Sequence, residues 1–240
     1  MYLIFHAPRR ITIYAKIGDD ILNKDKIISA SVINRLPRYY RFLGDLLEKN
    51  VKRISSRELS VLMSVTASQI RQDLNCFGGF GQQGYGYNVE QLHDEIGNIL
   101  GVKQKTPAIL IGAGNLGKTI ANQVRLPERG FELTAAFDKS PAIIGTELAG
   151  VTVSDIKELD SFCKKCHPKV AILCVPKASA AELADTLVSL GIKGIWNFSS
   201  YDFSRFSDTL KVVNVHLSDS IMTLSYLVTH DDEQNIPNTK

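Results

Sequence analysis

The spacing of apolar residues divides the chain into two regions with different periodicity. Over residues 29–105, apolar residues recur at helical spacing, as in the series from Val32 to Leu47. Over residues 106–230, short continuous apolar runs alternate with helical segments, a pattern typical of a parallel sheet with crossover helices. The sequence therefore predicts an α/β protein with an N-terminal helical domain, an extension over residues 1–28 and a polar tail over residues 231–240.

The helical region carries the signals of a helix-turn-helix. Pro37 suits the first turn of a helix, so we expect the main helix of this region to begin there. Ser55-Ser56-Arg57-Glu58 and Thr66-Ala67-Ser68-Gln69 match the capping-box pattern, and few residues separate the two helices that they open. Val89–Leu100 is amphipathic and should form a helix that connects the two regions.

A stretch rich in glycine and aromatic residues, Phe77–Tyr87, follows the second of these helices. Glycines allow tight turns and aromatic residues favour strands, so this stretch predicts a β-hairpin, which behind a helix-turn-helix forms a wing. Between Ser31 and Arg57 there are seven cations and two anions, an excess that suits phosphate contact and equally suits a solvated helix face. A structural module without a role in DNA binding is the alternative interpretation of this region.

The second region opens with a dinucleotide-binding motif. The apolar run Ala108–Ile111 leads directly into Gly112-Ala113-Gly114-Asn115-Leu116-Gly117, and a helical pattern follows. A strand, a G-x-G-x-x-G motif and a helix in this order are far more specific than the motif alone. Gly112 would permit a tight turn, Gly114 would let a pyrophosphate approach the backbone, and Gly117 would allow close packing of helix on strand.

An acidic residue stands where a ribose-binding carboxylate is expected. Asp138 ends the next apolar strand, 21 residues after Gly117. An aspartate there favours NAD(H) over NADP(H), because it accepts hydrogen bonds from ribose hydroxyls and repels a 2′-phosphate; Lys139 weakens this preference. Further apolar runs over residues 170–175 and 194–198 predict buried strands that end at the same cleft. The predicted cofactor-binding residues are Gly112, Ala113, Gly114, Asn115, Leu116, Gly117, Asp138, Lys139, Val175, Pro176, Asn197 and Phe198.

Four stretches together resemble the Rex family of redox-sensing transcriptional repressors. They are Arg35–Arg41, Val65–Arg71, Gly84–Val89 and Gly112–Gly117, and the resemblance extends over roughly residues 29–230. It implies a homodimer of winged-helix and Rossmann subunits that binds operator DNA when NAD+ or no cofactor is bound. It also implies that NADH releases the DNA.

The resemblance further implies that the C-terminal helix, at about Ser218–Thr229, is exchanged into the partner subunit near the cofactor. His216 stands where many relatives have an aspartate. The helix Thr66–Asn75 corresponds to the recognition helix, although relatives often carry basic residues at position 72 and in the wing. The candidate DNA-binding residues are Arg38, Tyr39, Arg53, Ser55, Thr66, Ser68, Gln69, Arg71, Gln72, Gln82, Gln83 and Tyr85.

Two other functions are compatible with a Rossmann motif. An NAD-dependent dehydrogenase needs an acid/base residue beside the nicotinamide and a substrate domain. Of the five histidines only His216 could lie near the cleft, and no second domain of sufficient size is evident, so no catalytic residue is predicted. A Rossmann-like domain that binds CoA or another nucleotide without sensing redox state is the third possibility.

The remaining sequence features set limits on the class of protein. Cys163-Lys164-Lys165-Cys166-His167 matches the pattern of covalent haem attachment, and a redox-active thiol pair is another minority interpretation. No metal site is predicted. No apolar run reaches 18 residues and the first residues lack a signal-peptide cleavage site, so a cytoplasmic protein is expected. The net charge of +3 is too small to identify a partner.

Overall fold

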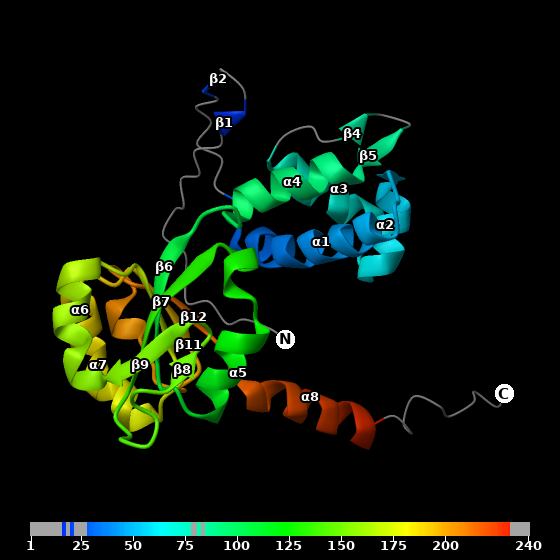
Figure 1. Cartoon of the computed structure of the whole chain (residues 1–240). Coiled ribbons are helices and arrows are strands. Elements are labelled where there is room, and N and C mark those ends of the chain that lie inside the picture. The colour runs from blue at the N-terminus through cyan, green and yellow to red at the C-terminus, as the bar shows by residue number, and fades with distance from the viewer. Residues whose placement is uncertain (1–15, 18–19, 22–27, 78–80, 83–84, 231–240) are drawn as a thin grey trace. The chain divides into compact units, whose positions relative to one another are not determined.

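The computed structural model of the chain describes residues 16–17, 20–21, 28–77, 81–82 and 85–230 (Figure 1). These residues belong to two compact units. The winged-helix unit extends to residue 104 and includes residues 128–130, and the Rossmann unit holds residues 105–127 and those from 131 onward. Most of the predicted extension, residues 1–28, and the whole predicted tail, residues 231–240, lie outside the described residues.

The winged-helix unit contains four helices whose first turns are capped by side chains. Ser55 caps α2 in a complete capping box with Glu58, and the hydroxyl of Thr66 accepts the Gln69 N–H at the start of α3. The predicted connecting helix is confirmed at its bounds, with Asn88 as its N-cap. The four helices are α1 (Ala30–Glu48), α2 (Ser56–Met63), α3 (Ala67–Asn75) and α4 (Val89–Leu100).

The prediction that the first helix begins at Pro37 is wrong. Helix α1 begins at Ala30, capped by Ser29, and Pro37 lies inside it. A proline in a helix interior removes one backbone hydrogen bond and crowds the preceding turn, at a cost of about 3 kcal/mol. Val32 and Leu36, which precede the proline, are both buried in the core of the unit. Their burial favours the helical conformation of this first segment and offsets the cost of the proline.

The wing is a small antiparallel sheet of three strands. It consists of β3 (Arg53–Ile54), β5 (Gly86–Asn88) and β4 (Gly81–Gln82), in that order. The strand β3, which comes before α2 in sequence, pairs with β5 and so joins the hairpin to the helix-turn-helix. The predicted hairpin is confirmed by the pairing of β4 with β5.

The Rossmann unit is built on a seven-stranded sheet. All neighbouring strands pair in parallel except β8 and β9, which are antiparallel. This sheet confirms the predicted α/β class. In spatial order the strands are β12 (Lys211–Asn214), β11 (Gly194–Asn197), β10 (Val170–Leu173), β6 (Thr106–Ile111), β7 (Phe131–Asp138), β9 (Val151–Asp155) and β8 (Glu147–Leu148).

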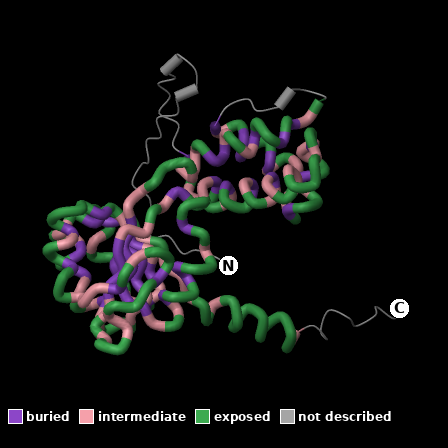
Figure 2. The backbone as a smooth tube through the Cα atoms, in the orientation of Figure 1, coloured by how far each residue is buried: buried purple, intermediate pink, exposed green. Residues whose placement is uncertain are grey.

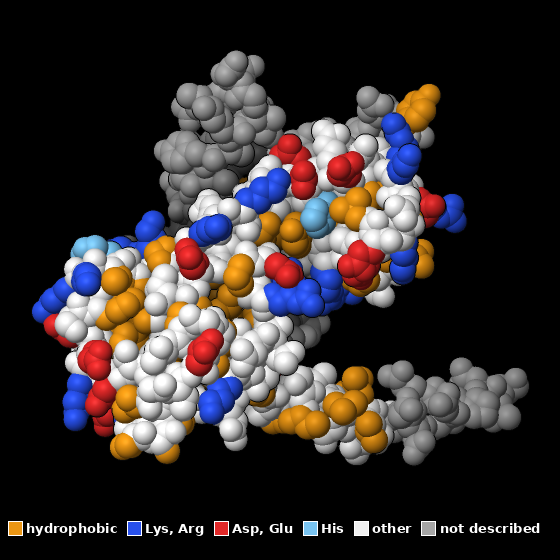
Figure 3. All heavy atoms as spheres, in the orientation of Figure 1, with side chains coloured by type: hydrophobic (Ala, Val, Ile, Leu, Met, Phe, Trp, Pro, Cys, Tyr) orange, Lys and Arg blue, Asp and Glu red, His pale blue; other side chains and the backbone are white. Residues whose placement is uncertain are grey.

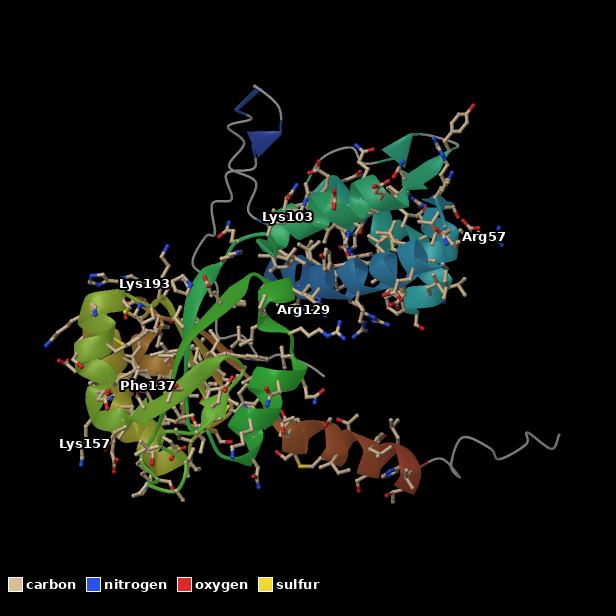
Figure 4. All side chains as sticks on the ribbon, viewed as in Figure 1. Arg57, Lys103, Arg129, Phe137, Lys157 and Lys193 are labelled. Atoms are coloured by element: carbon tan, nitrogen blue, oxygen red, sulfur yellow. The ribbon has the colours of Figure 1, made fainter. Side chains whose placement is uncertain are left out.

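Helices cover both faces of this sheet, which is why its strands are apolar on both sides (Figure 1, Figure 2). Ile109 and Ile111 pack in a cluster with α6 (Leu159–Cys166) and α7 (Lys177–Ser189). Leu110, between them, packs in the opposite cluster with α5 (Asn115–Gln123). Phe137 on β7 makes an edge-on contact with Phe162 of α6, at 5.6 Å between ring centroids (Figure 4).

The last helix, α8 (Leu217–Thr229), differs from the other α-helices described in this unit because none of its residues is buried (Figure 2). It nevertheless carries several large apolar side chains that are exposed, and Figure 3 shows them along the helix. No helix among the described residues is long and apolar enough to cross a membrane.

Candidate dinucleotide and DNA sites

The strand order of the Rossmann unit reverses beside β6. The chain leaves β6 for β7 on one side, whereas β10 lies on the other, and such a switch point forms a crevice at the carboxyl ends of the strands. Leu173 pairs with Ile111, and the N–H of Cys174 donates to the Ile111 carbonyl at 2.8 Å. The Gly112–Gly117 loop and the predicted residues Val175 and Pro176 therefore leave the sheet side by side.

The three motif glycines meet different surroundings. Gly112 has a φ of +96°, and a Cβ there would lie 2.5 Å from the Cys174 carbonyl oxygen. A Cβ on Gly117 would overlap the carbonyl oxygen of Gly112. A Cβ on Gly114 would meet no atom within 4 Å. Gly112 and Gly117 are thus required by the fold, whereas Gly114 keeps open a space that the protein itself does not fill.

Two helices begin at the carboxyl ends of these strands without side-chain caps. Gly114 is the N-cap residue of α5 and Pro176 is that of α7, and neither has a side chain that can accept a hydrogen bond. The N–H groups in the first turn of a helix lack intrahelical partners, and the helix dipole places partial positive charge there. The open space at Gly114 therefore faces a helix end that suits a phosphate group.

The carboxylate of Asp138 is held beside this loop. Its Oδ2 accepts the Ala113 N–H at 2.7 Å and its Oδ1 accepts the Ser140 N–H at 2.9 Å. Each carboxylate oxygen can accept a further hydrogen bond, so a diol such as a ribose could still be bound. Lys139, the next residue, is exposed.

Asn197, a predicted cofactor contact, is instead engaged by the protein. Its Nδ2 donates to the Tyr201 carbonyl at 2.9 Å and to Asn214 Oδ1 at 2.7 Å. Its Oδ1 accepts both the N–H and the hydroxyl of Ser199, and the residue is buried. Since this uses both amide donors and both lone pairs, Asn197 fixes the loop after β11 and is not retained as a direct contact. Phe198 is half-buried against Trp196, at 4.8 Å between centroids.

Three predicted DNA-binding residues lie on the solvent side of the recognition helix α3. Ser68, Arg71 and Gln72 are all exposed, at the spacing of one helix face. Arg71 Nη1 donates to the Ser56 hydroxyl of α2 at 3.2 Å, which orients its guanidinium. This face can present a cation and an amide to a nucleic acid groove.

The wing adds a second exposed group. Arg53 Nη1 donates to the Tyr85 carbonyl at 3.4 Å, and its guanidinium lies 5.8 Å from the centre of the Tyr85 ring, which is 71% exposed. The side chain of Gln82 and the whole of Gln83 lie outside the described residues.

Other predicted DNA contacts are exposed or serve as caps. Arg38 is exposed on α1, 5.8 Å from the centre of the Phe42 ring. Arg57, which was not among the predicted contacts, points outward from α2 (Figure 4). Ser55 and Thr66 use their hydroxyl oxygens as N-caps, which leaves their hydroxyl protons available for donation.

Tyr39 and Gln69 point into the winged-helix unit. Tyr39 is fully buried, so it cannot reach a DNA backbone and is not retained among the proposed contacts. Its hydroxyl donates to Asp73 Oδ2 at 2.9 Å, and Gln69 Nε2 donates to Asp73 Oδ1 at 2.8 Å. Gln69 therefore completes only half of the predicted capping box, because its side chain turns to Asp73 and not back to the Thr66 N–H.

Asp73, a residue not predicted from the sequence, is the buried polar centre of this unit. Its side chain is 1% exposed and accepts a bidentate pair from Arg35, at 2.6 Å from Nε and 2.7 Å from Nη2. Burial raises the pKa of Asp73, but the hydrogen bonds from Arg35, Gln69 and Tyr39 outweigh this and hold it below its ordinary value. Its position on α3, between the buried Ile70 and Leu74, was the signal available in the sequence.

All four cysteines are free thiols, and burial makes two of them poor nucleophiles. Cys163 is buried inside α6, and burial, with a smaller effect of Asp160, raises the pKa of its thiol to about 11. Burial raises the pKa of Cys174 to about 12. Haem attachment needs an accessible Cys163, so the buried thiol argues against it. Within the described ranges, no three His, Cys, Asp or Glu residues are grouped to hold a metal ion.

Comparisons with known proteins divide the chain at a similar place. A family model described as "Putative DNA-binding protein N-terminus" matches residues 27–75, and one described as "CoA binding domain" matches residues 103–201. The redox-sensing transcriptional repressor Rex of Caldanaerobacter subterraneus is 51% identical over 88% of this chain and 94% of that protein. Its namesake from Clostridioides difficile is 52% identical over 85% of this chain and 97% of the relative.

Solved structures give the same result. RSP in complex with β-NAD+ and operator DNA has a TM-score of 0.79 and 50% identity, covering 87% of this chain and 95% of RSP. RSP in complex with β-NADH also has a TM-score of 0.79, with 48% identity and coverage of 87% and 97%. A third structure describes RSP as a Rex-family repressor.

Proposed function

The chain belongs to the Rex family of redox-sensing transcriptional repressors, and we propose that it binds operator DNA through its winged-helix unit and releases it when NADH replaces NAD+. The observation that carries this proposal is the presence of both ligand sites in one chain, an exposed recognition face on α3 and an open phosphate loop at Gly114. The relatives quoted above are named as repressors and not as enzymes. A repressor must reach the chromosome, so we place the protein in the cytoplasm.

The crevice at the Gly112–Gly117 loop fits a dinucleotide. The N–H groups of the first turn of α5 would hold the pyrophosphate in the open space at Gly114. Asp138 would accept hydrogen bonds from the adenosine ribose, and Val175 and Pro176 would line the other wall of the crevice. NAD(H) supplies a nicotinamide whose charge differs between its oxidised and reduced forms, and this difference is the signal to be sensed.

Asp138 distinguishes this proposal from a CoA-binding function. The family model described as a CoA binding domain matches residues 103–201, a Rossmann-type unit that could accept several nucleotides. CoA carries a phosphate on its ribose, which a carboxylate at the Asp138 position would repel. Both RSP complexes contain NAD+ or NADH, which supports the same choice.

The DNA-binding surface combines phosphate contacts with groove contacts. We assign Arg38, Arg53 and the wing to the phosphate backbone, because cations there would position the protein without reading sequence. We assign Ser68, Arg71 and Gln72 on α3 to the major groove, where Arg suits guanine edges and Gln suits adenine edges.

We also propose that α8 packs on a second copy of the chain, as an exchanged helix in a homodimer. The helix carries exposed apolar residues along its length, among them Leu217, Ile221 and Leu224, and none of its residues is buried. Such an apolar helix is costly in water and marks an interaction surface. Two copies would also match the two half-sites that winged-helix dimers bind. Sedimentation of the wild type should give a dimer, and Leu224→Glu should shift it toward monomer.

The coupling between the two sites must follow linkage. A nucleotide changes the affinity for DNA only if it binds unequally to the DNA-bound and the free conformation. NADH must therefore bind the free conformation more tightly than the DNA-bound one, and NAD+ must show less of this difference. By reciprocity, DNA must weaken NADH binding by the same factor as NADH weakens DNA binding.

Fluorescence anisotropy with a labelled duplex carrying the operator bound by RSP tests this function. The wild-type protein should bind the duplex alone or with NAD+, and added NADH should release it. Identical effects of NADH and NAD+ would contradict the redox-sensing function, and release by CoA would favour the alternative ligand. Steady NADH oxidation with a metabolite would instead support the dehydrogenase hypothesis.

A further inference from the structure

The carboxylate of Asp73 joins the buried side of the recognition helix α3 to α1. Four donor contacts converge on its two oxygens, two from Arg35, one from Tyr39 and one from Gln69. Arg35 and Tyr39 belong to α1, whereas Gln69 belongs to α3 itself. A buried carboxylate that accepts several charge-assisted and neutral hydrogen bonds strongly favours one arrangement of the groups around it.

This arrangement determines which residues of α3 face outward. Gln69 and Asp73 lie one helical turn apart on the side of the buried Ile70, while Ser68, Arg71 and Gln72 lie on the exposed side. Successive residues of a helix are separated by 100° of rotation. A modest rotation of α3 about its axis would therefore turn the contact residues away from a groove, and the bonds to α1 oppose that rotation.

We infer that Asp73 and Gln69 are positioning residues, which set the rotation of α3 against α1, and that bases are read by Ser68, Arg71 and Gln72 without Gln69. This inference rests on the proposed binding of operator DNA. It replaces the expectation that Gln69 is itself one of the residues that contact DNA. The amide of Gln69 already donates to Asp73 at 2.8 Å, so base contact would require it to give up that bond.

The two glutamines of α3 provide a matched test. Gln69→Ala and Gln72→Ala remove the same side chain from the same helix, one on the Asp73 side and one on the exposed side. Each variant is titrated with the operator bound by RSP and with a set of duplexes that each change one base pair. If Gln69 is a positioning residue, its removal should lower affinity for the operator by roughly threefold to tenfold, the range expected for one lost hydrogen bond. Its loss should reduce discrimination at several base pairs together.

Gln72→Ala, in contrast, should abolish discrimination at one base pair and leave the other positions unchanged, as expected for a base contact. The same single-position pattern in Gln69→Ala would overturn the inference, and so would unchanged discrimination at every position. If the wild-type protein does not bind the operator, the proposed function itself is wrong, and the inference that rests on it falls too. If the wild type binds but Gln69→Ala behaves like Gln72→Ala, only the inference is wrong.

Variants of the buried pair separate positioning from simple loss of folding. Asp73→Asn leaves Arg35 without its charged partner and is expected to lower the melting temperature, so its DNA binding is measured well below that temperature. Arg35→Lys keeps the charge but loses the bidentate geometry. Folded Arg35→Lys should lose discrimination at several base pairs together, as expected for Gln69→Ala. Wild-type discrimination in folded Arg35→Lys and folded Asp73→Asn would contradict the positioning role.

Discussion

The two units prepare for their ligands in opposite ways. In the Rossmann unit, the site consists mostly of main chain, at the glycines and the N-terminus of α5, with one side-chain carboxylate at the end of β7. In the winged-helix unit, the site consists of side chains on the exposed face of α3, supported by a buried carboxylate beneath them. The first site depends on the absence of side chains at fixed points, and the second depends on the rotation of a helix.

This difference determines what a substitution should do in each unit. In the glycine loop, neighbouring positions should separate cleanly into those that the fold needs and those that the ligand needs. On the recognition helix, a substitution on the exposed face should affect DNA alone, whereas one on the Asp73 side should affect stability and DNA together.

The largest effect is expected at Gly117. Gly117→Ala would place a Cβ against the carbonyl oxygen of Gly112, and backbone cannot yield as a flexible side chain can. We expect a loss of roughly 3 kcal/mol in the free energy of unfolding, at the upper end of overpacking costs. Denaturant unfolding measures this, with Gly114→Ala as the matched control, which should retain wild-type stability because its Cβ meets nothing. Equal stability of the two variants would contradict the distinction between Gly117, which the fold needs, and Gly114, which only the ligand needs.

Gly114→Val should next separate the ligand from the fold. The larger side chain would fill the space left for a pyrophosphate, and an overpacking cost of about 3 kcal/mol corresponds to roughly a hundredfold weaker binding of NADH. Calorimetric titration with NADH checks this value. The variant should still bind operator DNA but should no longer release it on addition of NADH. Retention of NADH binding would show that the pyrophosphate lies elsewhere.

Arg71→Ala should give the reverse pattern. Loss of its guanidinium from the exposed face of α3 should weaken operator binding roughly tenfold, while NADH binding stays unchanged. The slope of log affinity against log salt tells which contact was lost. A phosphate contact would reduce the slope by about one, whereas a base contact would leave it nearly unchanged and relax one position of the operator.

A pH titration should produce a smaller effect, confined to the winged-helix unit. Hydrogen bonds lower the folded pKa of Asp73 below its ordinary value of 3.8, so its ionised form stabilises the fold above that pH. The stabilisation is lost as pH falls through the lower folded value. The difference in urea midpoint between wild type and Asp73→Asn should therefore be smaller at pH 3 than at pH 6. An equal difference at the two pH values would contradict this role.

The smallest effect is expected at Lys139. The side chain is exposed, so its attraction for a 2′-phosphate is screened by solvent. Lys139→Ala should raise the preference for NADH over NADPH by about twofold, compared in parallel titrations. A much larger change would mean that this lysine is held close to the nucleotide.

The glycine loop could be predicted from sequence because its constraints are local. Gly112 needs a positive φ and Gly117 needs contact with the Gly112 carbonyl, and both lie within one strand-turn-helix unit. The capping box at Ser55 and Glu58 is local in the same sense and is also confirmed.

The winged-helix site was less predictable because it depends on contacts distant in sequence. Tyr39 and Gln69 belong to family motifs, which gave no indication that both turn inward to Asp73. Pro37 is a helix-start signal, and only the burial of Val32 and Leu36 explains why α1 continues through it. Asn197 ends a strand as a ligand residue would, but Asn214 on the neighbouring strand engages its amide.

Sensing of the NADH/NAD+ ratio is tested by holding the total concentration of NAD+ and NADH constant at a saturating level while their ratio is changed. Anisotropy of the labelled operator reports the bound fraction of DNA. For a sensor of redox state, this fraction should fall as the NADH/NAD+ ratio rises, and the midpoint ratio should be the same at two different total concentrations. A bound fraction that follows the total concentration, or that stays constant across all ratios, would contradict redox sensing.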